Sequence, residues 1–387
     1  MSNQKAGVEM KAGKLWGGLF NWVRGQAVCL IAAGCAGISL FFVPPDGQTL
    51  KSVDWRVLGL LFCLMAVVAG LQACGLFGAL AQRLLAGRKS LRLLTAALVL
   101  LPFFCSMLVT NDVALLVFVP FAIMVLSQIG RSHYLIPTVV LQTLAANLGS
   151  MVTPVGNPQN LYLYARYSIA PMDFFATVLP PALLSLTGLL AACSLCIPNE
   201  HIEVRFLEHV SISDKRRLLL YLALFVLCLL TVFHLLPVAV LTILVTLMLL
   251  LFNRELFRRV DIGLLFTFFF FFIFAGNLGR ISAVREVLTS LTETGSGLTA
   301  VLTSQFISNV PAALLLSEFT ENWQGLLTGV NIGGLGTPIA SLASLISLRL
   351  YLKAPEAQPR KYLLWFTLAN LFGLAILLLF AALLGML

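Results

Sequence analysis

Asparagine, threonine and serine recur at fixed spacing inside long apolar segments of this sequence. Residues 147–160 read NLGSMVTPVGNPQN and residues 331–344 read NIGGLGTPIASLAS, and their Asn, Gly, Thr and Pro match at a constant offset of 184 residues. A proline with nearby glycines breaks a helix and frees backbone carbonyl and amide groups. Freed backbone groups beside neutral polar side chains predict a site for an ion or a small polar solute.

A second matched pair lies upstream of each break. Residues 107–112 read MLVTND and residues 305–310 read QFISNV, which aligns a Thr-Asn pair with a Ser-Asn pair. We expect these pairs to form the tips of two re-entrant hairpins, at 90–129 and 296–320. Such residues often serve only to hold membrane helices together, but a set repeated in two halves favours a binding site. The candidate substrate- and ion-binding residues are Thr110, Asn111, Asp112, Asn147, Thr153, Gly156, Asn157, Asn160, Ser308, Asn309, Asn331, Thr337, Ser341 and Ser344.

Asp112 is the one acidic residue that these predicted spans place deep in the membrane. A carboxylate there is costly, which makes a functional role the first hypothesis. Its aligned residue in the second half is Val310, so only one half carries the charge. We predict that Asp112, together with Asn111, binds the coupling proton or sodium ion. Capping of the second hairpin helix is the structural alternative, and both roles can coexist.

The composition defines the environment in which these residues act. Of 387 residues, 59% are apolar and only 11% are charged, and the mean hydropathy is +0.97. Soluble domains carry about a quarter charged residues, so the chain is predicted to be an integral membrane protein. The net charge of +9 comes from short basic clusters between apolar runs, which indicates membrane orientation and not nucleic-acid binding. No second membrane carboxylate, Ser-His pair or metal motif supports an enzyme, a metal site or a cofactor.

The apolar runs predict an all-α polytopic protein with about nine crossings. Orientation follows from the basic residues, because cytoplasmic loops are enriched in Lys and Arg. With the N-terminus inside and the C-terminus outside, only five of the 25 basic residues fall outside, namely Lys51, Arg56, Arg166, Arg280 and Arg285. An inner or plasma membrane is the expected location. The crossings are predicted at 25–43, 56–72, 135–167, 171–197, 217–234, 236–252, 262–279, 324–351 and 362–385.

The matched stretches predict two inverted repeats, each with a re-entrant hairpin and a broken transmembrane helix. The first repeat spans 25–197 and the second spans 217–387, because the extra span at 217–234 reverses the second half. A cytoplasmic N-terminal segment at 1–24 precedes them. A polar cytoplasmic linker at 198–216 separates them.

At these motifs the sequence resembles the ion transporter superfamily, which includes arsenite permeases, NhaD-type antiporters, citrate-type anion permeases and divalent anion:sodium symporters. The resemblance rests on TNDVALLVFVPF (110–121), ANLGSMVTPVGNPQN (146–160), SNVPA (308–312) and GVNIGGLGTPIASLAS (329–344) and covers roughly residues 25–385. It implies two inverted repeats, a scaffold that forms a homodimer, and a mobile transport unit. The hairpin tips depart from the Ser-Asn-Thr of the symporter branch, and Thr-Asn-Asp is more similar to the arsenite permease branch.

The predicted function is secondary active transport of a small inorganic or organic anion or oxyanion, coupled to H⁺ or Na⁺, by alternating access. No Lys or Arg is predicted at the membrane midplane, so a neutral or monovalent solute is easier to house than a dianion. The first alternative is a Na⁺/H⁺ antiporter that uses the same residues. A channel or a non-transport membrane protein is less favoured. Expected partners are the solute, the coupling ion, membrane lipid and a second copy of the chain, with no nucleic acid and no cofactor beyond Na⁺ as a candidate coupling ion.

Overall fold

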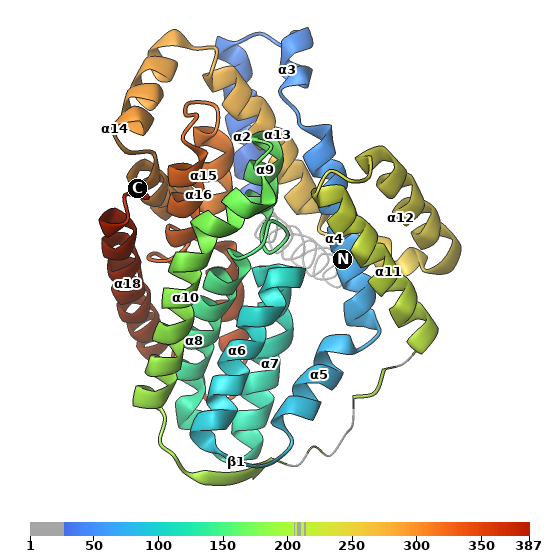
Figure 1. Ribbon diagram of the computed structural model, residues 1–387, viewed down its shortest axis with the longest axis vertical. Helices are drawn as coiled ribbons and strands as arrows, with labels where there is room; N and C mark the ends of the chain where they lie inside the picture. Colours follow the sequence, from blue (N-terminus) through green and yellow to red (C-terminus); the bar gives the residue numbers. More distant parts are fainter. Residues whose placement is uncertain (1–26, 205, 207–209, 213) are drawn as a thin grey trace, which may run out of the picture.

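The computed structural model describes residues 27–387 except 205, 207–209 and 213. The predicted N-terminal segment 1–24 and part of the predicted linker lie outside these described residues. Helices dominate the described chain, and they run largely along the long axis of the molecule (Figure 1). This arrangement is consistent with the composition, because a bilayer requires every backbone polar group to be satisfied within the protein.

The first helices form one side of the molecule, where α4 lies beside α11 and α12 (Figure 1). Aspartates begin two of them: Asp46 accepts hydrogen bonds from the backbone of Gln48 and Thr49, and Asp54 accepts from the backbone at 56 and 57. These caps satisfy the free amides at the helix starts. The helices are α2 (Ala27–Phe42), α3 (Gly47–Lys51), α4 (Trp55–Ala73) and α5 (Leu76–Leu85).

The next helices build the first hairpin and the first broken helix. All 16 residues of α8 are buried, and this helix packs against α6, α7 and α10 and is seen between α10 and α6 in Figure 1. Gln142 of α8 donates to the carbonyl oxygens of Leu98 and Phe118, which ties α8 to both arms of the hairpin. The elements are α6 (Leu91–Val109), α7 (Asn111–Gln128), η1 (Ser132–Tyr134), α8 (Leu135–Ser150), α9 (Pro158–Arg166) and α10 (Pro171–Cys196).

The remaining helices repeat this order after two further helices. Helix α14 is kinked at Gly295, where the backbone leaves helical geometry, so the arm that reaches the tip starts close to the predicted hairpin boundary at 296. The elements are α11 (Lys215–Val232), α12 (Val238–Phe252), η2 (Arg254–Arg259), α13 (Ile262–Leu278), α14 (Ser282–Ile307), α15 (Asn309–Leu316), α16 (Trp323–Ile332), α17 (Leu342–Tyr351) and α18 (Pro359–Leu383).

Five of the described helices are long and apolar enough to cross a membrane, namely α4, α6, α7, α10 and α18. The bent pair α13 and α14, with an angle of 101° at its break, would make a sixth. These apolar helices agree with a polytopic membrane protein. Helix length and composition do not show whether the shorter helices and the broken helices cross the membrane. The nine crossings and the orientation of the protein therefore stay predictions.

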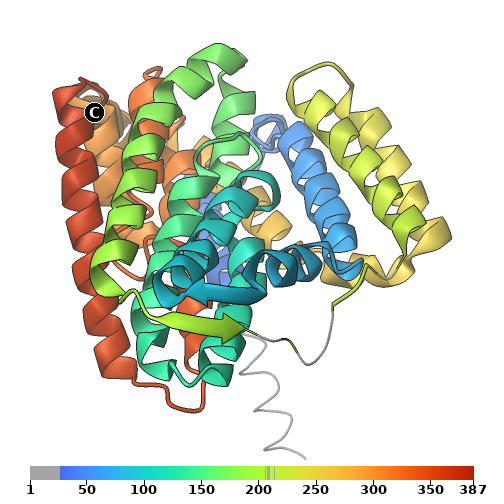
Figure 2. The same ribbon diagram turned by 60° about the horizontal axis from the view of Figure 1, so that its bottom comes forward.

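A two-stranded ribbon corrects the all-α expectation. Strand β1 (Gly87–Ser90) pairs antiparallel with β2 (His201–Val204), with Gly87 opposite Val204 and Ser90 opposite His201. Figure 2 shows this ribbon at the end of the molecule opposite the C-terminus. It joins the predicted linker to the loop before α6. The sequence did not indicate it because GRKS has no alternation of apolar and polar residues. Helix α5 was likewise not predicted.

Candidate functional site

Both hairpin tips have the same unusual backbone. Thr110, between α6 and α7, has φ 78° and ψ 149°, and Ser308, between α14 and α15, has φ 73° and ψ 155°. This region of backbone space is populated almost entirely by glycine and costs on the order of 1–3 kcal/mol per residue for other types. The two residues were aligned from sequence, and the structure gives them one conformation.

Each helix break is fastened to the hairpin of its own half. Thr153 Oγ1 donates to the carbonyl oxygen of Met107, and Thr337 Oγ1 donates to that of Gln305 at 3.0 Å. Each accepting carbonyl lies three residues before its hairpin tip. The threonine of the Thr-Pro break therefore holds the break against the tip in the same way in both halves.

Glycines permit this close approach. A Cβ atom on Gly149 would come within 2.1 Å of the carbonyl oxygen of Phe103, so α8 lies directly against the backbone of α6. A Cβ on Gly333 would come within 2.9 Å of Val301 Cα, so α16 lies in the same way against α14. Gly156 follows the first break, where a Cβ would come within 2.1 Å of the carbonyl oxygen of Ser150. Gly156 therefore permits close backbone packing at the break, and its role as a binding residue stays a prediction.

The two breaks are bonded to each other crosswise. Ser341 Oγ, at the start of α17, donates to Asn147 Oδ1 at 3.0 Å. Asn157 Nδ2, at the start of α9, donates to Asn331 Oδ1 at 3.2 Å. Ser341 and Asn157 are aligned residues at the offset of 184, as are Asn331 and Asn147. In each half, the residue at the start of the helix that follows the break therefore bonds to the asparagine of the other half's break.

The hairpin tips join this network. Asn111 Nδ2 donates to Asn147 Oδ1 at 3.0 Å. In the second half, the backbone amide of Asn309 donates to the carbonyl oxygen of Ala340 at 2.9 Å, and Ser308 Oγ donates to the same oxygen at 3.4 Å. Each tip is therefore bonded to a helix break, the first through side chains and the second largely through the backbone.

Asp112 lies in the first turn of α7. Its backbone amide donates to Asn111 Oδ1 at 3.0 Å. The carboxylate oxygen Oδ1 is buried and makes no hydrogen bond within the described part of the chain. The side chain as a whole is partly exposed. Oδ1 therefore does not accept the backbone hydrogen bonds that a helix-capping carboxylate would accept, and it is free to bind a proton or a cation.

The predicted residues do not all lie equally deep. Nine of them are buried polar side chains from both halves, namely Asn111, Asn147, Asn157, Asn160, Ser308, Asn309, Asn331, Ser341 and Ser344. Thr110, Asp112 and Thr153 are partly exposed, and Thr337 is exposed. Eight of these nine form hydrogen bonds at the two breaks, whereas Ser344 Oγ makes none within the described structure. The threonines lie at the edge of this network.

Two glutamines that bond to the hairpins and breaks were not predicted from the sequence. Gln305 accepts from the backbone amide of Thr337 at 2.9 Å and donates to the carbonyl oxygens of Gly333 and Leu335. Its aligned residue is Met107, so a search for identical residues in the two halves does not find Gln305. Gln142 bridges both hairpin arms, and its aligned residue at the offset of 184 is the apolar Leu326, so the match between the halves gave no signal for it.

Neutral groups supply the hydrogen bonds of this network. Within the described residues, the buried asparagines and serines bond to amides, hydroxyls and backbone carbonyls, and none of these bonds involves a Lys or Arg. The described chain also contains no group of three or more His, Cys, Asp or Glu able to hold a metal ion. The arrangement can bind a small polar solute through hydrogen bonds and half-helix ends.

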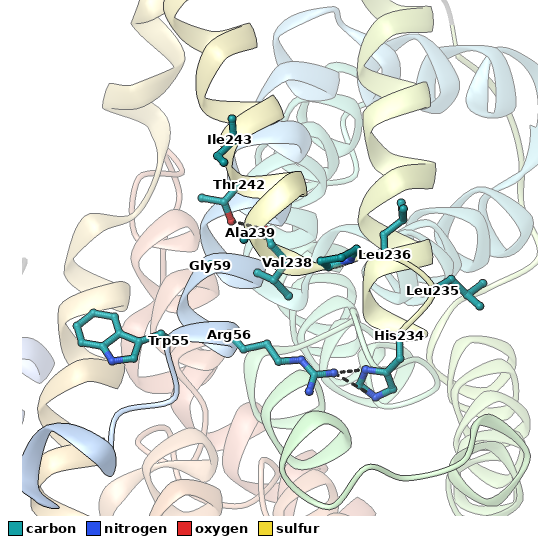
Figure 3. Close-up of a pocket in the computed structure, with 11 residues that line it drawn as sticks. Trp55, Arg56, Gly59, His234, Leu235, Leu236, Val238, Ala239, Thr242 and Ile243 are labelled. Carbon is teal, nitrogen blue, oxygen red and sulfur yellow. Dashed lines mark hydrogen bonds between the residues drawn. The ribbon is translucent and has the colours of Figure 1, made fainter.

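A large cavity lies elsewhere. It has a volume of about 900 Å³ and is formed where α4 meets the α11–α12 connection. Figure 3 shows the side chain of Arg56 directed at the ring of His234, with which it makes a close contact. None of the predicted site residues lines it. Trp55, Arg56, Gly59, His234, Leu235, Leu236, Pro237, Val238, Ala239, Thr242 and Ile243 line it.

Apolar helices around two hairpins and two bonded helix breaks define a polytopic membrane transporter. The chain belongs to the CitMHS citrate transporter family, whose model matches residues 18–322. An uncharacterized transporter of Methanocaldococcus jannaschii, MJ0456, is 33% identical over 304 residues, which are 78% of this chain and 83% of that protein. The inner membrane protein YbiR of Escherichia coli is 32% identical over 331 residues, 84% of this chain and 87% of that protein.

Two further similarities complete the comparison. The silicon efflux transporter LSI3 of rice is 32% identical over 164 residues, 42% of this chain and 33% of that protein. The crystal structure of the YdaH transporter of Alcanivorax borkumensis matches with a TM-score of 0.52 at 16% identity, covering 95% of this chain and 98% of that one. The predicted superfamily and the membrane location are confirmed, and the family, MJ0456 and LSI3 are all described as transporters.

Proposed function

We propose that this protein is a secondary active transporter that moves a small anion or oxyanion, coupled to H⁺ or Na⁺, by alternating access. The observation that carries the proposal is the crosswise bonding of the two helix breaks, each fastened to its own hairpin. Broken helices buried in protein are how transporters build sites near the bilayer midplane. The predicted nine-crossing topology, homodimer and cytoplasmic linker are part of this proposal.

Two inverted repeats, at 25–197 and 217–387, are supported by detailed equivalence. Hairpin-tip conformation, the threonine bond to the tip, and the glycine contact each occur once per half at aligned residues. Alternating access follows from such a repeat, because exchanging the conformations of the two halves opens the opposite side of the membrane.

The chemistry of the network favours a substrate of low charge. Its hydrogen bonds come from neutral groups, and a multiply charged anion without a cationic partner would be poorly stabilised in the membrane. The family is described as citrate transporters, while the rice relative is named for silicon efflux. We favour an oxyacid that is neutral or singly charged when bound, and we expect citrate to require co-bound cations.

Asp112 is the proposed site of the coupling proton or sodium ion, assisted by Asn111. Its buried, unbonded Oδ1 supports this role. In the Asp112→Asn variant we expect transport to lose its dependence on the proton or sodium gradient. Equal transport by this variant and the wild type at every pH and sodium concentration would contradict the role.

Flux into proteoliposomes tests the function. Internal pH and labelled citrate, silicic acid or arsenite are measured under an imposed proton or sodium gradient, for the wild type, Asp112→Asn and Asn309→Ala. The expected result is that gradient-driven accumulation of the solute is lost in both variants, in Asp112→Asn because transport no longer depends on the gradient. Sodium-dependent proton movement without any added solute would instead establish a Na⁺/H⁺ antiporter. Gly188→Ala serves as the control, because nothing lies within 4 Å of its added Cβ.

A further inference from the structure

The two asparagines at the helix breaks are aligned, yet their hydrogen bonding differs. Both polar atoms of the Asn331 side chain are hydrogen-bonded. Its Oδ1 accepts from Asn157. Its Nδ2 donates to Asn160 Oδ1 at 2.7 Å and to the carbonyl oxygen of Leu327 at 2.8 Å. Asn147 Oδ1 accepts two bonds, but its buried Nδ2 has no partner among the described residues. Because the bonding is crosswise, each arrangement combines residues of both breaks. Asn331 with the start of α9 is closed by protein and is called the closed break; Asn147 with the start of α17 keeps a free donor and is called the open break.

The residues that flank the asparagines differ in the same sense. Ser344 is aligned with Asn160 at the offset of 184. Asn160 donates to two backbone carbonyls of the first break and accepts from Asn331. Ser344 is 1% exposed, and its Oγ makes no hydrogen bond within the described structure. The open break therefore holds two buried polar atoms without partners, from two different elements.

The helix ends at the two breaks also differ. Asn157 Oδ1 accepts from the backbone amide of Asn160 at 2.9 Å and so caps the start of α9. Its aligned residue Ser341 donates its hydroxyl to Asn147 instead, and no side chain in the described structure caps the start of α17. An uncapped helix start carries free amides and the positive end of the helix dipole, which favours a negatively charged or electron-rich oxygen.

We propose that the protein has one substrate-oxygen site, at the start of α17, and that the equivalent position at the start of α9 is filled by its own side chains. Asn147 Nδ2 donates to an oxyacid or carboxylate oxygen, Ser344 Oγ bonds the same group, and the first amides of α17 complete the contact. This inference rests on the proposed function and adds that the two repeats do not contribute equivalent sites.

Energetics distinguish this arrangement from ordinary packing. A buried polar atom without a partner costs about 1–3 kcal/mol, and the equivalent atoms at the closed break avoid that cost through Asn160. Two such atoms at one uncapped helix end indicate that a bound solute is the missing partner. The ligand class is any small solute that presents an acceptor oxygen, from a carboxylate to a hydroxylated oxyacid.

Exchange of the aligned residues gives a matched test. Ser344→Asn copies the closed break onto the open one, and its amide oxygen would accept from Asn147. Ser344→Ala removes the free hydroxyl while breaking no protein hydrogen bond, so the unfolding temperature should not fall and should rise if the unpaired hydroxyl is costly. In proteoliposomes with labelled citrate, silicic acid or arsenite, we expect KM to rise about 10-fold in Ser344→Ala and transport to be lost in Ser344→Asn.

Asn160→Ser is the counterpart that opens the closed break. We expect its KM to rise less than that of Ser344→Ala, although it loses the bonds of Asn160 and should unfold at a lower temperature. An unchanged KM in Ser344→Ala, or an equal rise in Asn160→Ser, would overturn the single-site proposal while leaving transport itself established.

A labelling experiment does not depend on knowing the substrate. Ser344→Cys and Asn160→Cys are reacted in membranes with a small sulfonate-bearing thiol reagent, and the labelling of the parent chain is subtracted. We expect the cysteine at position 344 to react at least about 10-fold faster, because a site that admits an oxyanion admits the reagent. Equal rates at the two positions would rule out the asymmetry even if no solute flux were detected.

Discussion

The two strained tip residues store free energy at the point where the hairpins meet the helix breaks. Because Thr110 and Ser308 occupy backbone space suited to glycine, we expect Thr110→Gly and Ser308→Gly each to raise stability by about 1 kcal/mol. Transport should fall at the same time, since the tip loses its hydroxyl and its rigidity. Thermal unfolding in detergent and flux in proteoliposomes measure the two effects, and a loss of stability in either variant would show that the tips are not strained.

An ion pair outside the membrane-spanning helices gives a pH prediction. Arg280 donates to both carboxylate oxygens of Asp46, at 3.0 and 2.7 Å, and these bonds lower the pKa of Asp46 to about 2. The folded-state pKa lies below the ordinary aspartate value of 3.8, so the stabilisation is complete above that value and is lost as the pH falls towards 2.

The corresponding measurement is thermal unfolding of the wild type and Asp46→Asn across this acidic range. The wild type should lose a little stability as the pH falls, because the ion pair is lost. The variant never has this ion pair, so it should not show that loss. The effect is small because the pair is partly exposed and screened by salt. Parallel curves for the two proteins would mean that the pair contributes nothing.

At the scale of elements, the contact between each broken helix and its hairpin decides whether the site can form. Gly149→Ala would drive a Cβ into the carbonyl of Phe103, where only backbone could move. We expect a loss of stability of at least about 1–3 kcal/mol and a similar loss for Gly333→Ala. Unfolding temperature and the yield of monodisperse protein are the readouts. Gly188→Ala, in open space within α10, should be neutral, and a neutral Gly149→Ala would disprove the close contact.

For the whole molecule, the proposed alternating access predicts that the helices around the candidate site move against the α4, α11 and α12 side. Tyr164 of α9 stacks on His234, which follows α11, with ring centroids 5.9 Å apart. A mercury or disulfide cross-link between cysteines at these two positions should abolish flux, and a reducing agent should restore it. A control link between Thr143 and Ser347, whose hydroxyls are 2.8 Å apart, should have little effect because both lie on the site side. Full flux through the first cross-linked protein would exclude this motion.

The orientation of the whole molecule is a separate prediction. Figure 1 shows the C-terminus and α3 towards one end and β1 at the other, and most basic residues belong to the elements and loops of the β1 end, including α5, β1 and the start of α11. By the positive-inside rule the β1 end faces the cytoplasm. A C-terminal alkaline phosphatase fusion should therefore be active and a C-terminal green fluorescent fusion dark. The reverse pattern would invert the proposed topology.

The sequence alone was enough to identify the class of protein and the positions of its hairpin tips and helix breaks. Apolar runs of membrane length, prolines with glycines inside them and a repeated set of Asn, Thr and Ser are local signals, because hydropathy and helix breaking depend on neighbouring residues. They were sufficient for the hairpin tips, both breaks and the superfamily. The four-residue strands and α5 were missed because such short, polar or weakly patterned segments acquire their structure from partners elsewhere in the chain.

Only the tertiary structure decided which of these polar residues are satisfied. Sequence alignment of the halves treats Asn147 and Asn331 as equals, whereas their bonding depends on residues far away in the chain, such as Ser341 for Asn147 and Asn157 for Asn331. A free Ser344 hydroxyl, an unbonded Asp112 oxygen and a cavity at Arg56 are likewise invisible locally. Hydrogen-bond satisfaction is a property of three-dimensional neighbours, and the fold alone brings those neighbours together.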